Sequence, residues 1–161
     1  SIWQIAAASV EQECDVEFTH VPFDGAAPAV AALLGGNIQA VAVSPSEVKN
    51  NVNSGDFRVL TVLGENRSSV VPEVETATEM GINVTIQGWG AFAVPKDTPD
   101  EVVAILEAAA KTAIESEELK KVLAERGFEH AYLSGSEMDA KASAELQYFG
   151  ELIPKLGIVT G

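Results

Sequence analysis

Apolar residues recur along the chain at two alternating spacings, which predicts a succession of helices and strands. Helical spacing bounded by capping and stop residues predicts helices over 2–13, 28–34, 44–55, 73–80, 98–114 and 116–126, and a last helix that Ser134 caps and Pro154 bends or ends. Short apolar runs between turns predict strands over 17–21, 39–43, 58–63, 84–86, 91–94 and 129–133. Strands separated by helices of this length imply parallel pairing, so we expect an α/β fold with a mainly parallel sheet flanked by helices.

Capping residues mark several of these helix ends. Ser44-Pro45-Ser46-Glu47 combines a capping serine, a proline in the first turn and a glutamate three residues after the cap. Thr98-Pro99-Asp100-Glu101 and Ser134-Gly135-Ser136-Glu137 repeat the capping pattern. Glycines such as Gly127 follow the predicted ends, where a left-handed residue stops a helix.

Composition describes a folded protein and excludes some partners. The hydrophobic fraction of 47% among 161 residues is enough for one ordinary core. The net charge of −14, with ten Lys and Arg that form no stripe, argues against nucleic acid. No apolar run approaches the roughly 18–20 residues that a membrane helix needs, so we expect no direct membrane insertion.

Few side chains suggest catalysis or metal binding. The chain has no P-loop, no G-x-G-x-x-G, no H-E-x-x-H and no G-x-S-x-G string. His20 and His130 lie far apart without triad or metal spacing, and Cys14 fits a helix-packing role. We therefore expect no catalytic residue, no metal and no cofactor. The chain also begins without an initiator Met or a signal peptide. We therefore expect that it has been processed or truncated.

Seven strings along the chain carry a family resemblance. They resemble, in order and with similar spacing, the tripartite tricarboxylate transporter receptor family, also called the Bug family. The strings are V-P-F-D-G-A-A-P-A at 21–29, L-L-G-G at 33–36, S-P-S-E-V at 44–48, S-G-D-F-R-V-L at 54–60, V-P-E-V-E-T at 71–76, G-W-G at 88–90 and A-V-P-K-D-T-P at 93–99.

The resemblance implies a bilobed receptor of which this chain is the back half. Family members have a periplasmic-binding-protein type II-like fold, in which two α/β lobes enclose a cleft. Residues 1–88 would form the second ligand-binding lobe. Residues 89–161 would form a crossover strand and a C-terminal helical return segment that braces the first lobe, which is absent from this chain.

The function implied by the resemblance is solute capture. The receptor would be periplasmic and would bind a small carboxylate, which is a di- or tricarboxylate, an amino acid or an aromatic acid. It would deliver this ligand to the membrane permease subunits of a tripartite tricarboxylate transporter. The alternatives are a ligand-sensing effector domain of a transcription regulator with a similar fold, and an enzyme completed by the missing half.

Two strand-to-helix junctions offer main-chain N–H groups to a carboxylate. One spans residues 23–27 after the strand at 17–21, and the other spans residues 44–46 after the strand at 39–43. Both would lie at the carboxyl edge of a parallel sheet, where a helix start presents unpaired N–H groups and partial positive charge. A third junction begins at Ser1. The expected ligand-binding residues are Ser1, Gln4, Pro22, Phe23, Asp24, Gly25, Ala26, Ala27, Ser44, Pro45 and Trp89.

Asp24 departs from the family pattern, which often has lysine at this position. A carboxylate there would repel a bound carboxylate at contact distance. We therefore expect Asp24 either to point to solvent or to face an ammonium group of the ligand, which would favour an amino acid.

Overall fold

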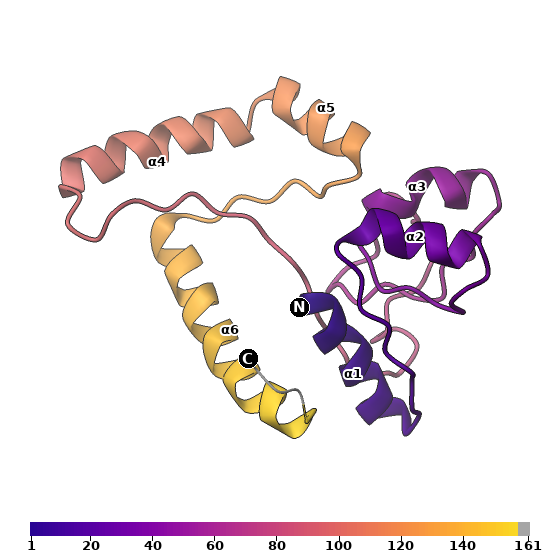
Figure 1. Ribbon diagram of the computed structural model, residues 1–161. Helices are drawn as coiled ribbons and strands as arrows, with labels where there is room; N and C mark the ends of the chain where they lie inside the picture. Colours follow the sequence, from indigo (N-terminus) through magenta and orange to yellow (C-terminus); the bar gives the residue numbers. More distant parts are fainter. Residues whose placement is uncertain (158–161) are drawn as a thin grey trace. The chain divides into compact units, whose positions relative to one another are not determined.

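Six α-helices form the regular structure of the computed structural model, which describes residues 1–157 (Figure 1). The helices are α1 (Ile2–Cys14), α2 (Ala26–Leu34), α3 (Pro45–Asn53), α4 (Asp100–Ile114), α5 (Glu117–Arg126) and α6 (Gly135–Lys155). No helix among the described residues combines the length and apolarity that crossing a membrane requires.

The chain divides into two compact units. Among the described residues, the first comprises Ser1–Gly88 with residues 156–157, and the second comprises Trp89–Lys155. Helices α1–α3 belong to the first unit and α4–α6 to the second. The assignment of the two parts of the chain to a second lobe and a return segment stays a prediction.

Local signals place most helix ends as predicted. The Ser116 hydroxyl accepts the N–H of Leu119 at 3.2 Å at the start of α5, and Gly127 ends that helix with φ 74°. The capping box at Ser44 is present at the start of α3. Helix α2 begins at Ala26, two residues before the predicted start at Pro28. Each of these helices closes its hydrogen bonds within a short stretch of sequence, which is why short-range patterns predict it.

The capping box expected at Thr98 is wrong. Pro99 is the residue that precedes α4, and no side chain caps that helix. The hydroxyl and the N–H of Thr98 both donate to the carbonyl oxygen of Pro95, at 2.7 and 3.0 Å. Thr98 therefore closes a turn ahead of the helix, and its side chain does not cap the helix start.

None of the six predicted strands forms a ladder within residues 1–157. Strand-type pairing there consists of one parallel bridge between Val62 and Thr76. Val62 donates its N–H to Glu75 at 3.2 Å and accepts the N–H of Ala77 at 2.9 Å. An extended segment makes its backbone hydrogen bonds only with another segment that lies beside it in space. A sequence pattern by itself therefore does not establish a strand.

The helix predicted over 73–80 is also wrong, because these residues form turns. The N–H of Ala77 bonds across to Val62 instead of to a carbonyl one helical turn earlier. Ile82 then donates to the Ala77 carbonyl at 2.8 Å, and Gly81 has the positive φ expected of a stop, at 82°. Pairing with a distant segment thus overrides local helical spacing.

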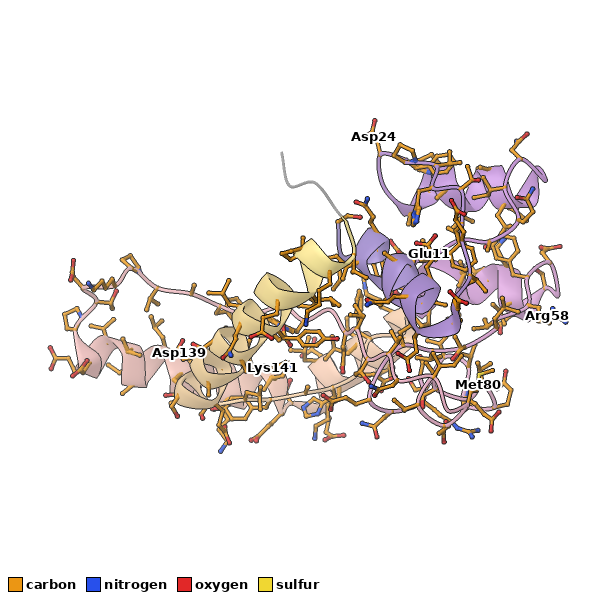
Figure 2. The ribbon with its side chains drawn as sticks, turned by 90° about the horizontal axis from the view of Figure 1, so that it is seen from below. Glu11, Asp24, Arg58, Met80, Asp139 and Lys141 are labelled. Atoms are coloured by element: carbon orange, nitrogen blue, oxygen red, sulfur yellow. The ribbon has the colours of Figure 1, made fainter. Side chains whose placement is uncertain are left out.

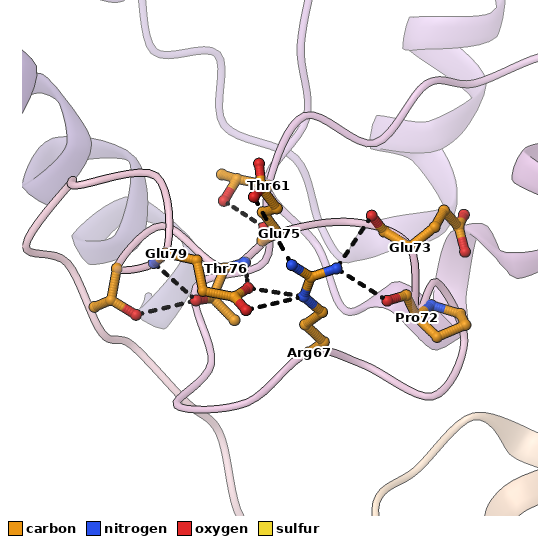
Figure 3. A network of polar contacts seen from close by, with 8 residues as sticks. Thr61, Arg67, Pro72, Glu73, Glu75, Thr76 and Glu79 are labelled. Atoms are coloured by element: carbon orange, nitrogen blue, oxygen red, sulfur yellow. Dashed lines mark hydrogen bonds and ion pairs between the residues drawn. The ribbon is translucent and has the colours of Figure 1, made fainter.

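Arg67 fixes the loop that carries this bridge (Figure 3). Its Nε donates to both carboxylate oxygens of Glu79, at 3.0 and 2.8 Å, and its Nη1 lies 3.5 Å from the carbonyl oxygens of Pro72 and Glu73. Glu79 also accepts the N–H of Thr76 at 2.8 Å. The mutual hydrogen bond raises the pKa of Arg67 and lowers the pKa of Glu79. Thr76 is therefore held in place for the bridge by the loop's own ion pair.

Small side chains make the core of the first unit, whereas the second unit has none of its own. The buried hydrophobic residues are Ala6, Ala8, Ala29, Val48, Val71, Ala77, Val84 and Ile86. No hydrophobic side chain is buried among residues 89–155, where Phe92, Leu146 and Ile105 are 96%, 78% and 69% exposed. The apolar stripes of α4 and α6 therefore lack a covering layer within the described residues.

Val71→Ala tests the core of the first unit. Val71 is 1% exposed, and losing two buried methyl groups with a residual cavity should cost about 2 kcal/mol of unfolding free energy. Urea unfolding followed on amide signals of the first unit measures this loss. Leu60→Ala is the matched control, since Leu60 is 63% exposed and should cost under ~0.5 kcal/mol. Equal losses in the two variants would contradict this assignment of the core.

Gly25→Ala tests the backbone at the start of α2. Gly25 has φ 99° and ψ 177°, although a Cβ there would meet no atom within 4 Å. The cost, about 2 kcal/mol, should come from backbone strain and not from collision. Gly88→Ala is the control, because a Cβ there meets only Ile2 at 4.0 Å and the φ is not positive. Denaturation that ranks Gly88→Ala as the more damaging change would refute the argument.

Candidate functional site

The start of α2 presents backbone donors without a side-chain cap. Gly25 precedes this nine-residue helix and donates its own N–H to the carbonyl oxygen of Phe23 at 3.0 Å. The N–H groups of Ala26 and Ala27 make no hydrogen bond to any described residue. The next residue, Pro28, has no N–H. Two amides and the positive end of the helix dipole are thus available to an anion.

The start of α3 is occupied by its own capping residues. The N–H of Ser44 donates to the Glu47 carboxylate at 2.9 Å, and the N–H of Glu47 donates to the Ser44 carbonyl at 3.0 Å. Pro45 has no N–H, and the hydroxyls of Ser44 and Ser46 are 2.9 Å apart. Sequence reasoning predicted this capping box but missed its consequence, which is that a carboxylate of the chain already lies at this helix end.

The start of α1 is a third, looser junction. The Ser1 hydroxyl accepts the N–H of Gln4 at 3.4 Å, and the Ser1 carbonyl accepts the N–H of Ile5 at 3.2 Å. Both Ser1 and Gln4 are exposed. Their side chains are therefore accessible, but one hydroxyl lone pair of Ser1 already serves the helix.

Helices α2 and α3 lie side by side in the first unit (Figure 1). Of the residues expected at these two junctions, Pro22, Phe23, Gly25 and Ala27 are exposed, while Ala26, Ser44 and Pro45 are half-buried. Two of the three junctions thus belong to helices that pack against each other. The two helix ends differ chemically, since α2 offers bare amides and α3 offers hydroxyls next to a carboxylate.

Asp24 lies at the tip of the loop before α2. Its side chain is exposed and points away from the ribbon (Figure 2). It makes no hydrogen bond or ion pair with a described residue. Whether Asp24 faces solvent or a ligand ammonium stays a prediction.

Trp89 belongs to the second unit and has a partner there. Its indole N–H donates to the Glu145 carboxylate at 2.6 Å, and Lys141 bonds the same carboxylate at 2.9 Å. Burial raises the pKa of Glu145, but the hydrogen bonds from Trp89 and Lys141 outweigh it and leave that pKa below its ordinary value. Sequence reasoning missed Glu145, and only its place four residues after Lys141 hinted at an ion pair.

The other titratable candidates have local partners. His20 bonds Glu11 at 2.8 Å, and the ring Nε2 of His130 lies 3.0 Å from the carbonyl oxygen of Ile114. Cys14 is a free, half-buried thiol. Over residues 1–157, no three His, Cys, Asp or Glu side chains gather in a way that would hold a metal ion.

Comparison with known proteins places the chain in one family. The model of the tripartite tricarboxylate transporter family receptor, TctC, matches residues 1–158. A Cupriavidus necator protein, described as a UPF0065 protein in the gbd 5′ region, is 31% identical over 143 residues, which are 89% of this chain and 43% of the relative. The protein BugT of Bordetella pertussis is 26% identical over 138 residues, 85% of this chain and 42% of BugT.

Solved structures confirm the predicted fold class. A TctC solute-binding protein from Polaromonas is 37% identical with a TM-score of 0.81, over 96% of this chain and 54% of that one. An R. palustris protein solved with adipate is 24% identical with a TM-score of 0.85, over 99% and 54%. The chain thus spans about half the length of these proteins, as one lobe would. The chain belongs to the tripartite tricarboxylate transporter receptor family, which is a family of solute-binding receptors and not a class of enzymes.

Proposed function

We propose that residues 1–88 form the second ligand-binding lobe of a periplasmic receptor that captures a small carboxylate. The observation that carries this proposal is the uncapped start of α2, where the N–H groups of Ala26 and Ala27 lack a partner among the described residues. A carboxylate oxygen is the acceptor that such a helix start favours. Family membership supports the same ligand class.

The strength of these contacts suits a receptor that grips its ligand from two lobes. A hydrogen bond to a charged group contributes roughly 1.5–3 kcal/mol net, and a helix end adds ~0.3–1 kcal/mol. Two or three such contacts from each lobe, less the cost of association, give about −8 kcal/mol, which is micromolar affinity. One lobe by itself supplies half of these contacts.

The acidity of the chain does not prevent anion binding. The net charge is −14, but exposed charges more than ~8 Å from the ligand are largely screened at physiological salt. Glu47 and Asp24 are the acidic residues closest in sequence to the two junctions. Glu47 favours α2 over α3 as the contact for the ligand carboxylate, because its carboxylate already bonds the Ser44 N–H at the start of α3, whereas the Asp24 side chain points away from the ribbon.

Residues 89–161 would form the return segment that braces a first lobe. Support comes from the exposed apolar side chains of α4 and α6 and from the absence of a buried hydrophobic side chain among residues 89–155. An apolar helix face is stable when another layer covers it. Trp89, which would line the cleft at the crossover, is 46% exposed.

The complete receptor would deliver its ligand to the permease subunits of a tripartite tricarboxylate transporter and would catalyse no reaction. This part of the proposal follows from the family. A ligand-sensing domain of a transcription regulator was the alternative, and no observation favours it.

Titration of the chain with adipate tests the α2 junction. Half of the contacts with the full cost of association leave less than about −4 kcal/mol, so binding should be millimolar or weaker and invisible to calorimetry at micromolar concentration. Amide NMR shifts should instead move at Ala26 and Ala27 as adipate is added. The neutral adipamide is the matched control and should leave both amides unmoved. Micromolar affinity in the chain by itself, or adipate shifts only at other residues, would refute the proposal.

Asp24→Ala tests whether Asp24 selects an amine. Because its carboxylate points away from the ribbon, the ratio of glutamate to glutarate affinity should change by less than about twofold, as expected for a screened exposed charge. Both affinities are measured on the Ala26 and Ala27 amide signals. A loss of glutamate preference in the variant would show instead that Asp24 meets the ligand ammonium.

A further inference from the structure

Glu11 collects four hydrogen bonds where α1 ends. Its backbone carbonyl accepts the N–H of Asp15 and, at 3.1 Å, that of Val16. Its carboxylate accepts the N–H of Phe18 at 2.6 Å and bonds the His20 ring at 2.8 Å. Asp15 has the left-handed φ of 52°, which turns the chain back at this point. Glu11 of α1 thus accepts hydrogen bonds both from the turn and from the segment that follows it.

The segment after the turn, residues 17–22, is held by Glu11. Among the described residues, the hydrogen bonds and ion pairs of residues 17–22 all end on Glu11. The segment was expected to be a strand, but it pairs with no neighbouring strand there and is exposed. It leads directly into residues 22–27, where α2 begins. The anchor point of the α2 junction on its upstream side is therefore Glu11, which Figure 2 labels on α1.

We propose that Glu11 is the positioning residue of the α2 junction, holding residues 18–20 on α1 so that the amides of Ala26 and Ala27 keep the geometry that receives a carboxylate. Its effect on ligand affinity rests on the proposed function, whereas its effect on the junction does not. Glu11 acts through the returning segment, and its side chain is tied to Phe18 and His20.

The charge of Glu11 supports this role. The N–H of Phe18 and then the His20 ring lower the pKa of Glu11, and His20 is the titratable group that faces it from the returning segment. On α1 itself, Glu13 faces a different partner, the N–H of Asn83 at 3.3 Å. Because the folded pKa lies below the unfolded one, the tie is at full strength above the unfolded pKa and is lost as pH falls through the folded pKa.

Amide NMR on the full chain, with adipate as the probe, tests the role of Glu11. In Glu11→Ala, the Phe18 amide should lose its exchange protection, the Ala26 and Ala27 amides should shift, and adipate affinity should fall about fivefold, as for one lost hydrogen bond. Glu11→Gln keeps an oxygen that accepts the Phe18 N–H, so it should restore the Ala26 and Ala27 positions. The acid-dependent shift of those two amides should be smaller in the same variant than in the unchanged chain, because glutamine does not titrate.

Glu13→Ala is the matched control, since it removes a carboxylate of the same helix that also accepts one backbone N–H. It should leave Phe18, Ala26 and Ala27 unchanged. The proposal is overturned if Glu11→Ala leaves the Ala26 and Ala27 amides in place, or if Glu13→Ala moves them equally. If adipate moves no amide in the unchanged chain while Glu11→Ala still displaces Ala26 and Ala27, the carboxylate site fails and the positioning role stands.

Discussion

The N–H and C=O groups of a helix bond to one another, whereas those of an extended segment need a neighbour from elsewhere in the chain. This difference governs the whole of the described chain. Six helices form, and strand-type pairing among residues 1–157 reduces to the bridge at Val62 and Thr76. The bridge itself needs Arg67 and Glu79 to hold the loop that carries Thr76.

The hydrogen-bond partners of the main-chain N–H groups also distinguish the two helix starts of the candidate site. At α3 the N–H of Ser44 is satisfied by the Glu47 carboxylate, and the N–H of Glu47 is satisfied by Ser44. At α2 a glycine takes the place of a capping side chain, and two amides stay open within the described residues. A strong capping sequence and an open anion site are thus alternatives at a helix start. The start of α2, which has the weaker capping sequence, is therefore the better candidate for ligand contact.

Sequence predicted the features that depend on a few neighbouring residues. Ser116 and Gly127 bound α5 as expected, because cap and stop act within one turn. Residues 73–80 had helical spacing but bonded to Val62 instead, and Thr98 turned back to Pro95. The contact of Trp89 with Glu145 joins residues 56 positions apart, and no local pattern indicated it. The position of the α2 junction was predicted, but its anchor on Glu11 was not, because that contact needs the left-handed turn at Asp15.

Trp89, which donates a hydrogen bond to Glu145, gives the second unit an intrinsic fluorescent probe. Trp3 and Trp89 are the two tryptophans of the chain, one in each compact unit. Trp89 is 46% exposed and donates its indole N–H to Glu145, whereas Trp3 on α1 is 40% exposed. Replacing either indole by phenylalanine leaves fluorescence that originates in a single unit. Melting of the two units becomes separable in this way without an added dye.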